Sequence, residues 1–118
     1  IMFTIIDDKH KDVLYTGLNV EQRQAKLKPD NRFLLTEDYE TTPQVGKTKL
    51  DTTTHDFVAM TWTEVKACRD RILAASDWRD LPSYAGSDQV AWRTYRQKLR
   101  DLPQDYTDVE DIVFPTEP

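Results

Sequence analysis

The first third of the chain alternates short apolar runs with polar turns. Apolar and β-branched residues fill positions 2–6 and 13–16, and charged residues fill the stretch between them, 7–12. Two such runs around a polar turn predict a β-hairpin. Residues 32–36 predict a third strand, and 20–28 predict a short helix. We expect a small antiparallel sheet that packs on the C-terminal helices or on another chain, because an isolated hairpin is only marginally stable in water.

The next segment, 37–56, has no apolar periodicity and contains six threonines. This composition predicts a loop or linker, ending in a short strand near 57–60. Within it, residues 45–48 superficially resemble a phosphate-binding loop. That motif requires a glycine five residues before Gly46, and Thr41 stands there instead. We therefore interpret Gly46 as a turn residue.

A helix is predicted to start near Trp62. Thr61 and Glu64 have the spacing of a capping box, in which each side chain bonds the backbone N–H of the other residue. An apolar stripe at helical spacing supports the same helix and consists of Val65, Cys68, Ile72 and Ala75. The pattern ends at Ser76 and Asp77.

A second helix is predicted after a turn at Leu81 and Pro82, because the residue before proline avoids helical dihedral angles. Ser87 or Asp88 can cap this helix, and Pro103 should end it. Its apolar stripe consists of Trp92, Tyr95, Leu99 and Leu102. Two amphipathic helices with a short connection should pack antiparallel.

The chain is therefore predicted to be α+β. Residues 1–60 should form a small β-rich region with a threonine-rich loop, and residues 61–118 a helical hairpin followed by an extended, proline-containing acidic tail. A chain of 118 residues has room for one main core. We expect most of the buried area between the helices to come from the aromatic residues Trp78, Trp92 and Tyr95.

The charge balance is acidic. Lys and Arg total 16 against 21 Asp and Glu, a formal net charge of −5. This disfavours a general nucleic-acid surface, because phosphate binding needs clustered positive charge. Three arginines share one face of the second predicted helix: Arg93, Arg96 and Arg100. We expect this basic ridge to pair with the acidic tail, whose carboxylates include Asp101, Asp105, Asp108, Glu110 and Asp111.

The C-terminal residues 112–118 have a different character. Two prolines, Pro115 and Pro118, favour an extended conformation, with Val113 and Phe114 as apolar anchors. Such a segment can dock on its own domain or insert into a partner. Both alternatives remain open from the sequence.

No residues have the spacing of a catalytic, metal or cofactor site. Cys68 is the single cysteine and is predicted to be a buried thiol. His10 and His55 lack partners at triad or metal-ligand spacing. No apolar run is long enough for a membrane span, and residues 1–6 are too short for a signal peptide. We therefore predict a non-enzymatic protein without a cofactor.

The C-terminal half carries a recognisable series of residues. Trp92-x-x-Tyr95-Arg96-x-x-Leu99 is followed by a short acidic loop and then by Val113-Phe114-Pro115-x-x-Pro118. Over residues 64–118 this series resembles the small tail assembly chaperones of tailed bacteriophages and their relatives, the tail fibre assembly proteins. Phe114 is a departure, since many relatives have tryptophan before the proline. Arg96 matches the Tyr-Arg pair of the family.

The resemblance implies a chaperone that binds an unfinished phage tail or tail-fibre protein in the host cytoplasm. The alternative is a structural component of the tail, baseplate or fibre that stays in the virion. Partner contacts are expected from the basic ridge and the tail, namely Arg93, Arg96, Arg100, Val113, Phe114, Pro115 and Pro118. Self-association into a homo-oligomer is left open. The start at Ile1 also leaves open that the chain is cut from a longer fibre protein.

Overall fold

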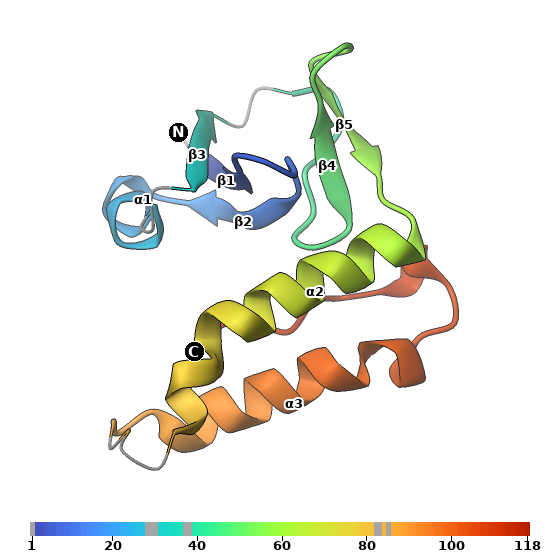
Figure 1. Ribbon diagram of the computed structural model, residues 1–118. Coiled ribbons are helices and arrows are strands. Elements are labelled where there is room, and N and C mark those ends of the chain that lie inside the picture. Colours follow the sequence, from blue (N-terminus) through green and yellow to red (C-terminus); the bar gives the residue numbers. More distant parts are fainter. Residues whose placement is uncertain (1, 28–30, 37–38, 82–83, 85) are drawn as a thin grey trace. The chain divides into compact units, whose positions relative to one another are not determined.

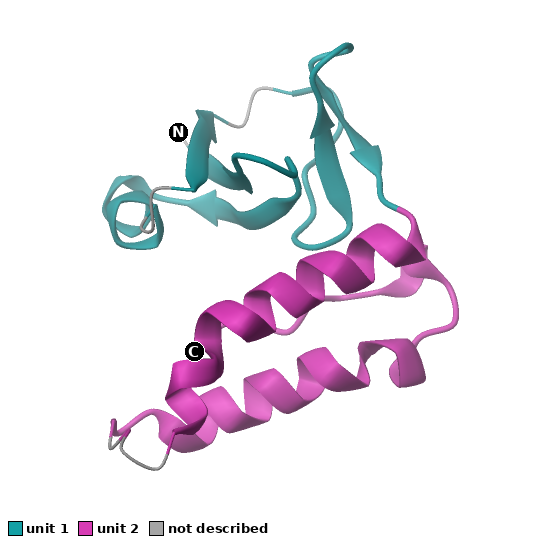
Figure 2. Cartoon of the chain, viewed as in Figure 1, with its two compact units in different colours: residues 1–60 teal, residues 61–118 magenta. Residues whose placement is uncertain are grey.

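The computed structural model contains two compact units, Ile1–Met60 and Thr61–Pro118 (Figure 2). It describes residues 2–27, 31–36, 39–81, 84 and 86–118. The first unit contains the strands and one short helix, and the second contains the longer helices (Figure 1). The predicted α+β class is confirmed.

Unit 1 is built around a three-stranded antiparallel sheet in the order β2-β1-β3. Its elements are β1 (Phe3–Asp7), β2 (Val13–Leu18), α1 (Val20–Lys26) and β3 (Arg32–Thr36). These confirm the predicted hairpin, short helix and third strand. The helix α1 begins with a capping box, because the backbone N–H of Gln22 donates to Asn19 Oδ1 at 2.8 Å and the N–H of Asn19 donates to Gln22 Oε1 at 3.0 Å.

The central strand β1 is buried on both faces. Phe3 and Ile5 form a cluster with Leu18, against which the partly buried Tyr15, Leu27 and Leu34 pack. Ile6, on the opposite face, clusters with Val13 and Phe57, which lies beyond the threonine-rich segment. Because side chains alternate across a strand, neighbouring isoleucines enter different clusters. Each face of the sheet is thus covered by side chains of the same unit.

The threonine-rich segment is more ordered than predicted. Residues that we expected to be a loop form β4 (Thr48–Asp51), which pairs antiparallel with β5 (Asp56–Ala59). The predicted strand near 57–60 is confirmed as β5, but the loop prediction for 48–51 is wrong. The pairing stabilises β4, because a strand can be fixed by its partner without an apolar period of its own. Gly46 lies in a turn with φ of 70°, which confirms its predicted role.

In unit 2, α2 (Trp62–Ser76) begins and ends where the sequence predicts. The N–H of Glu64 donates to Thr61 Oγ1 at 3.3 Å, and the N–H of Thr61 donates to Glu64 Oε1 at 3.1 Å, so the capping box is confirmed. Val65 and Cys68 are buried, and Cys68 forms no disulfide. The 3-10 helix η1 (Asp77–Asp80) follows, and Leu81 then takes an extended backbone, as predicted. Pro82 lies outside the described residues.

The second long helix, α3 (Gln89–Asp105), carries the predicted stripe, with Trp92, Tyr95, Leu99 and Leu102 all buried. Asp88 stands at its N-cap position, but its carboxylate bonds other side chains instead of capping the backbone. The predicted end at Pro103 is wrong. Helix α3 continues to Asp105, because proline removes only one donor and the next turn still closes through Tyr106 N–H to Leu102 O at 3.1 Å.

The burial predicted for Trp78 is also wrong, since this side chain is 49 % exposed. Trp92 and Tyr95 are buried, as expected. The 3-10 geometry of η1 turns Trp78 away from the stripe of α2, and its ring instead meets Tyr84 edge-on with ring centroids 5.2 Å apart.

After α3 the chain forms η2 (Val109–Asp111) and a tail without regular structure. The indole Nε1 of Trp62 donates to the carbonyl oxygen of Thr107 at 2.9 Å, which ties this region to the start of α2. In Figure 1 the red segment after η2 runs back toward the end of α2. Ile112 and Phe114 are buried, whereas Val113 between them is 73 % exposed. The tail therefore docks on its own chain.

Candidate partner-binding surface

The three arginines of the predicted basic ridge do not share one environment. Arg96 is buried at 2 % exposure, whereas Arg93 and Arg100 are exposed. None of the three pairs with an acidic tail residue among the parts of the chain that the structure describes. The predicted pairing of ridge and tail is therefore not observed.

Arg96 instead joins the two helices. Its Nη1 donates to the carbonyl oxygen of Leu73 at 2.7 Å and to the hydroxyl of Ser76. Its Nε donates to Asp80 Oδ2 at 2.9 Å, and its Nη2 forms an ion pair with Asp77. One guanidinium thus binds the last turn of α2 and both carboxylates of η1.

This arrangement has an electrostatic cause. Helix α2 has no basic residue in its last turn, where the partial negative charge of the helix dipole and the open carbonyls would favour a cation. Arg96 supplies that cation from α3. Partial burial raises the pKa of the Asp80 carboxyl, but the hydrogen bond and charge of Arg96, followed by those of Arg100, outweigh this effect and lower the pKa overall.

An open groove of about 370 Å³ lies beside this ion pair, lined by Asp80, Arg93, Gln97 and Arg100. Arg100 Nη2 lies 3.4 Å from Asp80 Oδ2, the same oxygen that Arg96 binds more closely. Gln97 Nε2 donates to Asp101 Oδ1 at 3.0 Å. Two exposed guanidinium groups and the Asp80 carboxylate line the groove, so the lining residues together carry one net positive charge.

A second cluster holds the end of the hairpin. The guanidinium of Arg79 stacks over the ring of Trp92 at 3.8 Å and over Trp78 at 4.3 Å from the ring centroids. Its Nη1 lies 3.3 Å from Asp88 Oδ2, which also accepts from Trp92 Nε1 at 2.9 Å. A hydrogen bond from the Tyr84 hydroxyl lowers the pKa of Asp88, and the same bond raises the pKa of Tyr84.

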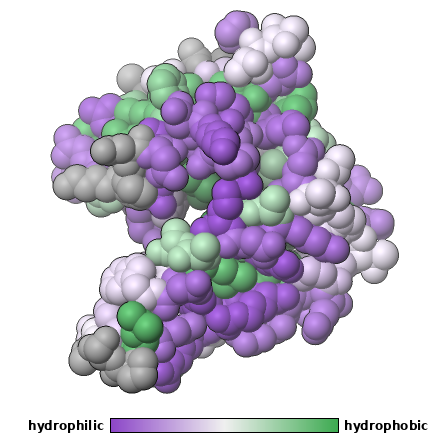
Figure 3. Space-filling view, in the orientation of Figure 1, coloured by the Kyte–Doolittle hydropathy of each residue, from purple (hydrophilic) through white to green (hydrophobic). Residues whose placement is uncertain are grey.

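Large apolar side chains are exposed around this cluster. Trp78 is 49 %, Leu81 52 % and Val90 75 % exposed. In Figure 3 the same end of unit 2 shows green, hydrophobic atoms beside the grey ones. Single exposed apolar side chains are ordinary, but three within one short stretch of a small unit provide a surface that a partner can cover.

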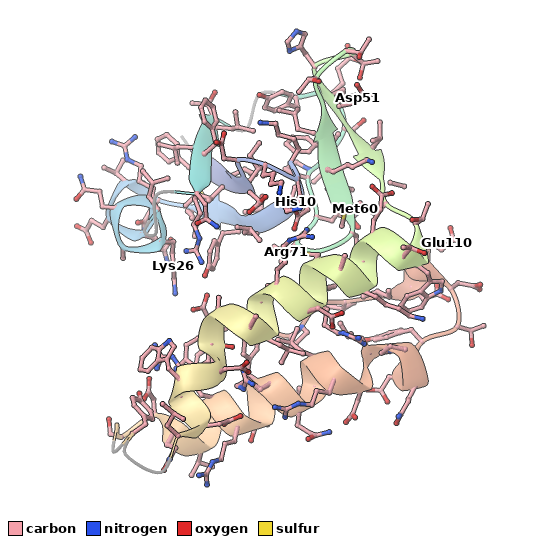
Figure 4. The ribbon with its side chains drawn as sticks, in the orientation of Figure 1. His10, Lys26, Asp51, Met60, Arg71 and Glu110 are labelled. Carbon is pink, nitrogen blue, oxygen red and sulfur yellow. The ribbon has the colours of Figure 1, made fainter. Side chains whose placement is uncertain are left out.

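The tail residues predicted from the sequence to contact a partner also differ in their exposure to solvent. Phe114 is buried, Pro115 is half-buried, and Val113 and Pro118 are exposed. Ile112, which was not among the predicted contact residues, is 1 % exposed and is the other apolar anchor of the tail. Figure 4 shows Glu110, in η2, near the start of α2. Docking on the same chain thus uses Ile112 and Phe114 and leaves Val113 on the surface.

One group of metal-ligating residues occurs in the described part of unit 1. Asp7, His10 and Asp12 bring ligand atoms within 4.8 Å of one another. The sequence predicts no partner for His10 at triad or metal-ligand spacing, and this residue lies in the turn after β1 (Figure 4). Asp7 Oδ2 is 2.8 Å from His10 Nδ1 and accepts the backbone N–H of His10 at 2.6 Å. The spacing Asp-x-x-His-x-Asp was the available signal, but these bonds are also those of an ordinary side-chain-stabilised turn.

In the described part of the chain, no helix combines the length and the apolar character needed to cross a membrane.

Comparison with known proteins gives one result. The family described as phage tail assembly chaperone protein matches residues 62–118, which confirms the resemblance inferred from the sequence for this part of the chain. The matched residues coincide almost completely with unit 2. No curated protein and no solved structure gives a significant match.

Proposed function

We propose, from the match of residues 62–118 to the phage tail assembly chaperone family, that this chain binds a tail or tail-fibre protein and keeps it competent for assembly. The match is the observation that carries the proposal, and it supports a role in phage tail assembly and a non-enzymatic mode of action. The protein would act in the host cytoplasm while the tail is being built.

The surface of unit 2 is suited to such a role. A chaperone must cover apolar surface that its client exposes before oligomerisation, and it needs apolar side chains of its own to do so. Trp78, Leu81, Val90 and Val113 are exposed in this unit. Its interior remains closed, because the stripe of α3 and the tail anchors Ile112 and Phe114 are buried. The unit can therefore offer apolar contacts without opening its core.

The residues predicted to bind a partner then separate into two roles. Arg93 and Arg100 in the groove, and Val113 and Pro118 in the tail, are accessible and are the proposed partner contacts. Arg96 and Phe114 are buried and act as positioning residues, which hold the helices and the tail in place. Pro115 lies half-buried between the two sets.

The test is co-expression of the full chain with each tail and tail-fibre protein of the same phage. A client should give a higher soluble yield with the chain than without it, and the two proteins should co-elute in size-exclusion chromatography. A maltose-binding protein fusion of unit 1 alone, residues 1–60, provides a control for nonspecific solubilisation. If no tail or fibre protein gains solubility or binds the chain, the chaperone proposal is wrong.

Quantitative mass spectrometry of purified virions and infected-cell lysate separates the transient chaperone from the structural alternative. A transient chaperone should be abundant in lysate and absent from particles. A fixed number of copies in each particle would instead make the chain a component of the tail, baseplate or fibre, or a chaperone that remains attached.

A further inference from the structure

We propose that the groove lined by Asp80, Arg93, Gln97 and Arg100 binds an acidic, extended segment of the client, in which two carboxylates stand three residues apart. This inference rests on the proposed function, because it names the chemical class of the partner segment. It concerns a surface different from the apolar side chains at the end of the hairpin.

The charge of the groove favours an anionic ligand. Among the residues that line the groove, two guanidinium groups stand against one carboxylate, that of Asp80, which contacts Arg96 Nε at 2.9 Å and Arg100 Nη2 at 3.4 Å. Arg93 is exposed and forms no ion pair with the residues that the structure describes, and the side chain of Arg100 is 44 % exposed. This local positive charge lies in a chain whose net charge is −5. A guanidinium binds a carboxylate through two parallel N–H donors, which makes the planar arginine pair a suitable receptor.

The spacing of the two arginines limits the ligand. Arg93 and Arg100 are seven residues apart on α3, which corresponds to about 10.5 Å along the helix axis. In a β-strand, side chains three positions apart point to opposite faces, but a polyproline II segment has three residues per turn, so its positions i and i+3 lie on one side, about 9 Å apart. Two acidic side chains at positions i and i+3 of a segment in this polyproline II conformation can therefore reach both guanidinium groups. Gln97, one turn from each arginine, lines the middle of the groove.

The acidic tail of the same chain does not occupy this groove. Ile112 and Phe114 are buried, and no residue of 112–118 lines the groove. Asp105 and Asp108 are exposed, and Asp101 accepts its hydrogen bond from Gln97. The two arginines thus remain accessible to a segment from another protein.

The experiment uses the full chain and a defined probe. A fluorescein-labelled Gly-Ser peptide with two glutamates at i and i+3 is titrated by fluorescence anisotropy, alongside a peptide of the same composition with adjacent glutamates. The variants are Arg93→Gln, Arg100→Gln and the double change. Lys98→Gln is the matched control, because Lys98 is exposed on the same helix but does not line the groove.

The i,i+3 peptide should bind more tightly than the adjacent-glutamate peptide. Each single arginine change should weaken its binding about threefold to tenfold, as expected for the loss of one charge-assisted contact, and Lys98→Gln should leave the affinity unchanged. Binding should also weaken as salt is raised. Circular dichroism and melting of each variant confirm that the fold is retained.

Three results would overturn the inference: equal binding of both peptides, equal loss in Lys98→Gln and the arginine variants, or stronger competition by a single-stranded oligonucleotide than by the peptide. The co-expression assay separates this failure from that of the proposed function. If the arginine variants no longer bind the peptide but still raise the client's soluble yield, the groove is not the site of the client segment. The chaperone function then stands. If the wild-type chain raises no client's yield, the proposed function is wrong whatever the peptide does.

Discussion

The guanidinium of Arg96, in the middle of α3, donates a hydrogen bond of 2.7 Å to the carbonyl oxygen of Leu73, near the end of α2. The two residues are 23 positions apart in the chain. The same side chain also binds Ser76, Asp77 and Asp80. The closure of the helical hairpin therefore depends on one buried cation as well as on apolar packing.

Replacement of Arg96 by methionine should lower the free energy of unfolding of unit 2 by about 2–4 kcal/mol, because it removes the guanidinium that donates to the Leu73 carbonyl and the Ser76 hydroxyl. Arg96→Lys should cost less, since it keeps the charge but loses the planar fork. Urea denaturation followed by tryptophan fluorescence measures this directly, because all three tryptophans lie in unit 2.

The control is Arg93→Met, which changes the same side chain at an exposed position of α3 and should alter stability by no more than about 0.5 kcal/mol. Equal losses in the two variants would mean that the contacts of Arg96 with α2 contribute nothing specific.

Much of the helical hairpin could be predicted because its signals are local. The capping box of Thr61 and Glu64 and the stripe from Trp92 to Leu102 depend on neighbours within one or two helical turns. The role of Arg96 is different. We grouped it with Arg93 and Arg100 by charge, although it lies four residues after Trp92 and three before Leu99, within the apolar face of α3. That angular position was the signal that it would be buried.

The features that the sequence did not predict depend on contacts with the next segment of the chain, which the periodicity of one segment does not show. Strand β4 is stabilised by pairing with β5, and its own residues do not alternate between apolar and polar in a way that predicts a strand. Trp78 looked like a core residue by type, but the 3-10 turn of η1 directs it toward Tyr84 and Arg79. In both cases a contact with a nearby segment overrides the preference of the residues taken alone.

The tail anchors give a second stability prediction. Phe114→Ala should lower the unfolding free energy of unit 2 by about 2–4 kcal/mol, because it removes a ring that is 9 % exposed. Val113→Ala, at a neighbouring position that is 73 % exposed, should cost less than about 0.5 kcal/mol. Urea titrations of the two variants compare them. If Val113→Ala lowers the free energy of unfolding more than Phe114→Ala does, then Val113 and not Phe114 anchors the tail.

The pH dependence of unit 2 should reflect Asp80. Its pKa is lowered from the ordinary value of 3.8, so the folded state favours the carboxylate more than the unfolded state does. The resulting stabilisation is complete above about pH 5 and is lost as the pH falls below 3.8 and through the folded pKa. Tryptophan-monitored urea midpoints between about pH 6 and pH 3 should therefore fall toward acid.

The variant Asp80→Asn tests the assignment, because an amide cannot titrate in this range. This variant should be less stable than the wild type at neutral pH, and its urea midpoint should fall less as the pH is lowered. Asp105→Asn, which changes an exposed carboxylate at the end of α3, should keep the wild-type slope. An unchanged slope in Asp80→Asn would show that other carboxylates cause the acid sensitivity.

Alanine substitutions of the two tryptophans at the end of the hairpin should lower the free energy of unfolding by very different amounts. Trp92 is 5 % exposed, lies 3.8 Å from the Arg79 guanidinium and donates to Asp88, so Trp92→Ala should cost about 3–5 kcal/mol. Trp78 is half exposed, and Trp78→Ala should cost about 1 kcal/mol or less. Urea unfolding followed by far-ultraviolet circular dichroism avoids dependence on the removed fluorophore. If the two losses are equal, Trp78 packs in the core as its residue type suggested. If only Trp92 is costly, Trp78 is free to serve a surface role.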